Sequence, residues 1–111
     1  MALFRYFTEK DDKYVELSYE GMSYKKNPIS VCITQKKAEG TYSKIEDLQP
    51  ITYTDEQAKE GFIIKSSLGQ VKIKWVTRFW IISEMQVFID DYKLAGSEII
   101  RIEGFESGKY I

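Results

Sequence analysis

Apolar and polar residues alternate with a period of two in several separate segments of this chain, and this feature constrains the fold most. The alternating segments are Tyr14–Tyr19, Ile29–Gln35, Val71–Ile82 and Glu98–Glu103. Because successive side chains on a β-strand point to opposite faces, this pattern predicts half-buried strands. The aromatic-rich segment Leu3–Phe7 predicts one more strand. The chain is therefore expected to fold mainly as β-sheet.

Turn and helix-capping motifs separate these strands. Phe62–Ser66 and the run from Val71 flank the turn residues Ser67-Leu68-Gly69-Gln70, which predicts a β-hairpin. Just before it, Thr54 and Gln57 form a capping-box pattern and Gly61 provides a stop, which predicts a short, exposed helix.

The polar stretch Lys36–Gln49 shows neither a strand nor a helix period. We expect it to be a loop, with one helical turn near Ser43–Leu48.

The segment from Ser83 to Gly96 fits two structures. Ser83 and Gln86 form a second capping-box pattern, and one helical face collects Met85, Phe88, Ile89 and Tyr92. Gly96 follows the expected end of this helix, where glycine is common. The alternative is a tight hairpin that pairs Val87–Ile89 with Tyr92–Leu94 across Asp90-Asp91, and its β-branched residues favour that version. We predict the helix.

These patterns predict a single α+β domain that spans residues 1–111. Its antiparallel β-sheet has about five to seven strands, and the amphipathic helix at residues 83–95 packs on it. The alternative is an all-β sandwich or small barrel. A length of 111 residues suits one domain with one core.

Composition excludes several classes of function. The 16 basic and 17 acidic residues nearly cancel, whereas a dedicated nucleic-acid or membrane binder usually has a lopsided charge. The chain has no histidine, the commonest general base and metal ligand. No segment has the ~20 apolar residues that a membrane-spanning helix needs, and the apolar run at the N-terminus is too short for a signal peptide. We expect a cytoplasmic protein that is not an enzyme and needs no cofactor or metal.

Two kinds of side chain are candidates for chemistry. Cys32 is the single cysteine and has no histidine to activate it, so we interpret it as a small packing residue. Carboxylates occur as sequence neighbours, such as Asp90-Asp91, but adjacent residues point in different directions on a strand or a helix. We interpret these acids as turn and surface residues.

The strand from Val71 to Ile82 carries the most distinctive pattern. Alternation places Val71, Ile73 and Trp75 on one face, and Trp75 is expected to be buried. The opposite face carries the candidate binding residues, which Lys65 on the preceding strand can join: Lys65, Lys72, Lys74, Arg78 and Trp80. Trp80 is expected to be less buried than Trp75.

This basic and aromatic face suggests two functions. The first is binding to a protein partner, as in inhibitors, immunity proteins, adaptors and accessory proteins of phages or mobile elements, because tyrosine, tryptophan and arginine supply much of the energy at protein interfaces. The alternative is binding to single-stranded nucleic acid, where cations meet phosphates and rings stack on bases. The near-zero net charge favours the protein partner, and the sequence leaves the oligomeric state open.

Overall fold

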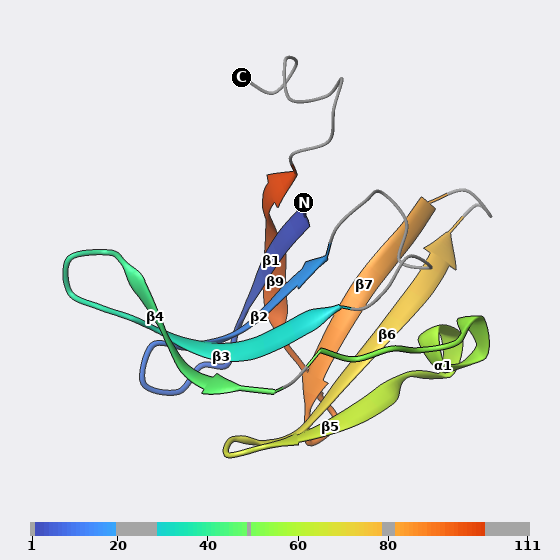
Figure 1. Ribbon diagram of the computed structural model, residues 1–111, viewed down its shortest axis with the longest axis horizontal. Helices are drawn as coiled ribbons and strands as arrows, with labels where there is room; N and C mark the ends of the chain where they lie inside the picture. Colours follow the sequence, from blue (N-terminus) through green and yellow to red (C-terminus); the bar gives the residue numbers. More distant parts are fainter. Residues whose placement is uncertain (1, 20–28, 49, 79–81, 102–111) are drawn as a thin grey trace. The chain divides into compact units, whose positions relative to one another are not determined.

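The computed structural model describes residues 2–19, 29–48, 50–78 and 82–101. It divides into two compact units, one formed by residues 1–52 and 95–111 and the other by residues 53–94. Antiparallel sheets dominate both units, and the described part of the chain contains one short helix (Figure 1). The α+β or β-rich class is therefore confirmed. The strands form a five-stranded and a four-stranded sheet, not one sheet of five to seven strands. That the two units behave as one domain stays a prediction.

The first unit is a five-stranded antiparallel sheet with the order β4-β3-β2-β1-β9. Its strands are β1 (Ala2–Phe7), β2 (Lys13–Tyr19), β3 (Ser30–Lys36), β4 (Tyr42–Asp47) and β9 (Ala95–Arg101). The strands predicted at Tyr14–Tyr19 and Ile29–Gln35 are confirmed. Val15 and Leu17 on β2 lie opposite Ile33 and Val31 on β3, and all four are fully buried or nearly so. These aliphatic side chains form the centre of this unit's core.

The prediction of a loop with a helical turn at residues 43–48 is wrong, because β4 occupies this segment. It pairs with β3 at the edge of the sheet, from Lys36 opposite Tyr42 to Cys32 opposite Asp47. An edge strand that is exposed or half-exposed along its whole length needs no apolar alternation, so its sequence carries no period of two.

The second unit is a helix followed by a four-stranded antiparallel sheet with the order β5-β6-β7-β8. Its elements are α1 (Asp55–Glu60), β5 (Phe62–Ser66), β6 (Gly69–Arg78), β7 (Ile82–Ile89) and β8 (Tyr92–Lys93). The capping box is confirmed, since Thr54 Oγ1 accepts from the Gln57 N–H and the Gln57 side chain accepts from the Thr54 N–H. The hairpin between β5 and β6 is also confirmed.

The predicted helix at residues 83–95 is wrong, and the alternative hairpin is correct. β7 pairs with β6 from Arg78 opposite Ile82 to Val71 opposite Ile89. Asp90 and Asp91 have φ angles of 47° and 69°, the two positive values that a tight type I′ hairpin turn requires. Gly96 then lies in β9 opposite Tyr6, not at the end of a helix. Long-range pairing with β6 thus overrides the local helical period.

Trp75 is buried, as predicted, and belongs to the core of the second unit. Its ring stacks on Tyr53 at 5.2 Å and lies 6.4 Å from the ring of Phe62. The neighbouring core positions on the same face of β6, Val71 and Ile73, are completely buried. The period-two assignment of β6 is therefore correct from Val71 to Trp75. In the described part of the chain, no helix has the length and apolar character needed to cross a membrane.

Candidate functional site

One row of side chains crosses the face of the four-stranded sheet that is opposite the face carrying Trp75. Ile63 on β5 lies opposite Lys72 on β6, Lys72 lies opposite Phe88 on β7, and Phe88 lies opposite Lys93 on β8. Directly paired residues of antiparallel strands project to the same side, so the four side chains share this face. Lys65 and Lys74 lie two residues from Ile63 and Lys72 and project the same way. We call these six residues the lysine face: Ile63, Lys65, Lys72, Lys74, Phe88 and Lys93.

The charge of the lysine face is predominantly positive. Its four lysines meet two carboxylates, since Lys72 Nζ lies 3.9 Å from Asp91 and Lys93 Nζ lies 4.0 Å from Glu84. Within the described residues, Lys65 and Lys74 make no ion pair. Both contacts are at the limit of an ion pair and partly or fully exposed, so they neutralise the lysines weakly. The electrostatic potential at this face is therefore positive.

Apolar groups lie among these charges. Ile63 is 57% exposed. The Lys72 ammonium lies 5.0 Å from the centroid of the half-buried Phe88 ring, within the range of a cation–π contact. An apolar centre with cationic neighbours can take up apolar and acidic side chains together.

The structure brings three of the five predicted binding residues together. Lys65, Lys72 and Lys74 share the lysine face. Arg78 is the last residue of β6, opposite Ile82, but its side chain is not among those described, and Trp80 lies outside the described residues. Their roles stay predictions.

Sequence reasoning missed Ile63, Phe88 and Lys93 as members of this face. Ile63 could have been found from the predicted hairpin, because its register sets residue 63 opposite residue 72. Phe88 and Lys93 could not be found while residues 83–95 were interpreted as a helix.

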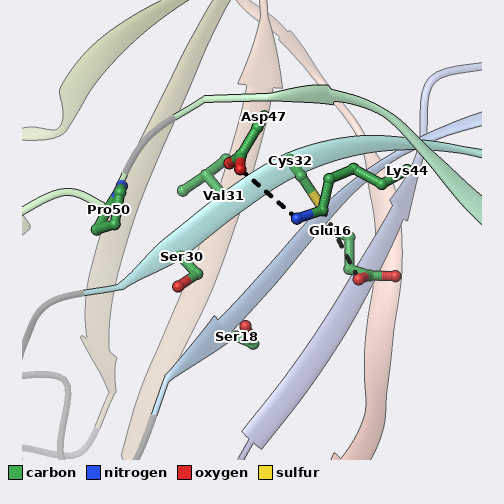
Figure 2. Close-up of a pocket in the computed structure, with 8 residues that line it drawn as sticks. All are labelled: Glu16, Ser18, Ser30, Val31, Cys32, Lys44, Asp47 and Pro50. Carbon is green, nitrogen blue, oxygen red and sulfur yellow. Dashed lines mark hydrogen bonds and ion pairs between the residues drawn. The ribbon is translucent and has the colours of Figure 1, made fainter.

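A second candidate site is a hollow on the five-stranded sheet. Paired positions place Arg5, Glu16, Cys32 and Asp47 in one row across β1, β2, β3 and β4. The hollow has a volume of about 280 Å³. It is lined by Glu16, Ser18, Ser30, Val31, Cys32, Lys44, Asp47 and Pro50 (Figure 2).

The charged groups of this hollow are already paired with one another. Arg5 Nε donates to Glu16 Oε1 at 2.8 Å, and Lys44 Nζ lies 3.6 Å from Asp47 Oδ2. Figure 2 shows the Lys44 and Asp47 side chains reaching toward each other beside Cys32. Among the described residues, no group of three or more cysteine and acidic side chains is placed to hold a metal ion.

Cys32 is a poor nucleophile in this setting. Burial raises the pKa of its thiol to about 11, the Glu16 carboxylate adds to this rise, and Lys44 opposes it. The thiol also lies 3.9 Å from Glu16 Oε2, to which it can donate a weak hydrogen bond. Since the thiolate is the reactive form, the raised pKa disfavours reaction of Cys32 near neutral pH. The interpretation of Cys32 as a packing residue agrees with its burial.

Comparisons with protein-family models, with curated proteins and with solved structures find no match to this chain.

Proposed function

We propose that this chain is a small, non-catalytic binding protein that acts by association with a protein partner, and that the lysine face is its contact surface. The observation that carries the proposal is the row Ile63, Lys72, Phe88 and Lys93, in which exposed apolar area and cationic groups alternate across four strands. Interfaces of this kind combine an apolar centre with a polar rim.

The engagement of Phe88 favours a protein over single-stranded nucleic acid. A base stacks on an aromatic ring whose face is open. In this structure the Lys72 ammonium lies 5.0 Å from the centre of the Phe88 ring, so a stacking base would have to displace it. The exposed group beside the lysines is the aliphatic Ile63, which offers a base no π-face and suits an apolar side chain of a protein.

The state of the titratable groups supports a non-catalytic role. The hollow around Cys32 offers a thiol of raised pKa and carboxylates held in ion pairs. Asp90 is engaged in the hairpin turn, where its Oδ1 accepts from the Gln70 N–H at 2.9 Å. The raised pKa of the Cys32 thiol disfavours the thiolate, which is the reactive form of cysteine.

The experiment is affinity capture from cells that make the protein, followed by titration of the purified captured protein. The wild type is compared with the double variant Lys72→Glu/Lys74→Glu. The matched control is Lys36→Glu/Lys37→Glu, which reverses two exposed lysines of the other unit. We expect the double variant to bind at least ~10-fold more weakly, because charge reversal repels an acidic partner, while the control keeps wild-type affinity.

A single-stranded oligonucleotide titrated over a range of salt tests the alternative. Single-strand binding would give a steep salt dependence, which Lys72→Ala would reduce by about one unit of slope. Two results together would overturn the protein-partner proposal in favour of single-strand binding. One is tight oligonucleotide binding whose salt slope falls in Lys72→Ala, and the other is equal capture of the partner by the wild type and the double variant.

A further inference from the structure

The two sheets end in four edge strands, β4 and β9 in one sheet and β5 and β8 in the other. Open edges invite pairing with another chain, and proteins usually protect them with bulges, charges or short strands. β4 and β9 each show a register irregularity against their neighbour, and β8 has two residues. β5 pairs regularly with β6 over all five residues, and its sequence is apolar except for Lys65 and Ser66. Among the described strands, β5 is the edge with the least protection.

The backbone of β5 presents hydrogen-bonding groups outward at two residues. The Gln70 N–H donates to Asp90 Oδ1, and the Gln70 C=O accepts from the Asp90 N–H, so both groups of Gln70 point away from β5. Its partner on β5 is Lys65, which makes this a non-hydrogen-bonded pair of the antiparallel ladder. The N–H and C=O of Lys65 therefore also point away from β6. By the period of two, those of Ile63 do the same.

The same two residues carry the exposed side chains of this strand. Ile63 and Lys65 both project onto the lysine face, and both are exposed. Lys72, the neighbour of Ile63 in the register, adds a second positive charge beside the edge. An added strand would thus find backbone partners, an apolar contact and two cations along one line.

We propose that β5 receives an extended, acidic segment of the partner as an additional strand of the four-stranded sheet. This inference rests on the proposed function and specifies how the partner binds. Backbone bonds to Ile63 and Lys65 supply the register. The partner's side chains on the lysine-face side are acidic near Lys65 and Lys72 and apolar beside Ile63, because charge complementarity selects the partner and apolar contact stabilises it.

The probe is a blocked peptide of repeated Val-Thr-Glu-Thr, which places valine and glutamate on the same face of an extended strand. Its control, the valine–lysine peptide, has the same length and repeats Val-Thr-Lys-Thr. Amide NMR of the full chain follows the titration. We expect the amide protons of Ile63 and Lys65 to shift downfield and to exchange more slowly, while that of Ile64, already bonded to β6, changes little. The valine–lysine peptide should bind at least ~10-fold more weakly.

Two pairs of variants separate the backbone from the side chains. Ile63→Pro removes an outward N–H and leaves the ladder to β6 intact, since proline is tolerated on edge strands. It should reduce peptide binding at least ~10-fold, whereas Ile63→Ala, which keeps the N–H, should reduce it less. Lys65→Glu should weaken binding by a similar factor, whereas Lys93→Glu, three strands away, should have a smaller effect.

Three results would overturn strand addition. One is the absence of peptide binding by the wild type. Another is binding without slower exchange at Ile63 and Lys65. The third is a concentration-dependent dimer that Ile63→Pro abolishes, which would assign the edge to a second copy of this chain. A fourth result separates the two proposals: Lys72→Glu/Lys74→Glu loses the partner, but Ile63→Pro binds it normally. In that case the lysine face is still the interface, and only strand addition is wrong.

Discussion

The Lys72 ammonium lies 5.0 Å from the centroid of the Phe88 ring, directly across the β6–β7 pair. This contact joins the cationic and apolar parts of the lysine face, so a change at Phe88 alters both. Phe88→Ala removes the ring and is expected to weaken partner binding by at least ~1.5 kcal/mol. Phe88→Trp keeps an aromatic ring for Lys72 and should retain most of the affinity. Titration of the captured partner measures both, and equal affinities for the wild type and Phe88→Ala would remove Phe88 from the interface.

Trp75 anchors the ring stack with Tyr53 and Phe62, and its loss should be costly. Trp75→Ala is expected to lower the free energy of unfolding by about 3–5 kcal/mol, as large aromatic truncations do in a packed core. The control is Ile63→Ala, because Ile63 is exposed and its truncation should change stability by no more than about 0.5 kcal/mol. Urea unfolding followed by far-UV circular dichroism gives both values. Similar losses for the two variants would mean that the assignment of faces on the sheet is wrong.

Substitutions at Asp91 discriminate between the hairpin and a helix, because the sign of the change in stability differs between the two structures. Its φ of 69° is unfavourable for most residues but natural for glycine in a type I′ turn. Asp91→Gly should therefore not lower the stability, because glycine adopts this φ without a steric cost, and Asp91→Val should destabilise the protein by about 1–2 kcal/mol. In a helix, glycine would instead destabilise by about 0.5–1 kcal/mol. Thermal unfolding of the two variants gives the sign of each change in stability.

The thiol of Cys32 should react slowly with iodoacetamide in the folded protein. A pKa of about 11 leaves about 0.1% thiolate at pH 8, and the rate should rise with pH toward that value. Glu16→Gln removes the carboxylate that helps to raise this pKa, so it should speed the reaction, while Glu39→Gln in an exposed turn should not. Rapid modification of the folded wild type at pH 8 would contradict the raised pKa.

The same shift predicts how stability depends on pH. The folded-state pKa lies above the ordinary value of 9.0, so the unfolded chain loses the Cys32 proton first. The stabilising contribution of the protonated thiol is complete below pH 9 and is lost as the pH rises toward 11. The stability of Cys32→Ser, measured by urea unfolding at several pH values, should lack the part of the decrease between pH 9 and pH 11 that the thiol causes.

The sequence predicted β1, β2, β3, β5, β6 and β9 as strands and missed β4, β7 and β8. Alternation located β2 and the start of β6, where every second residue is buried. It also located β3, where Val31 and Ile33 are buried but Cys32 and Thr34 are buried as well. β4 gave no signal, since it is exposed or half-exposed along its length and is held by pairing with β3. β7 fits a helical period as well as a strand period, and only its pairing with β6 decides between them.

The residues of the candidate site were predictable only where their strands were. Lys65, Lys72 and Lys74 could be placed on one face because a hairpin joins their strands. Phe88 and Lys93 belong to the face through the hairpin that was only the alternative interpretation of residues 83–95 and through the pairing of β7 with β6.

Amide hydrogen exchange of the complex with the captured partner tests the central claim most directly. If the lysine face is the interface, partner binding should slow exchange in β5–β8, between residues 62 and 93, with the largest effect at Ile63 and Lys65. Exchange in β2 and β3, which line the hollow around Cys32, should be unchanged. Slower exchange confined to β2, β3 and β4, with β5–β8 unaffected, would contradict the claim and move the interface to the other sheet.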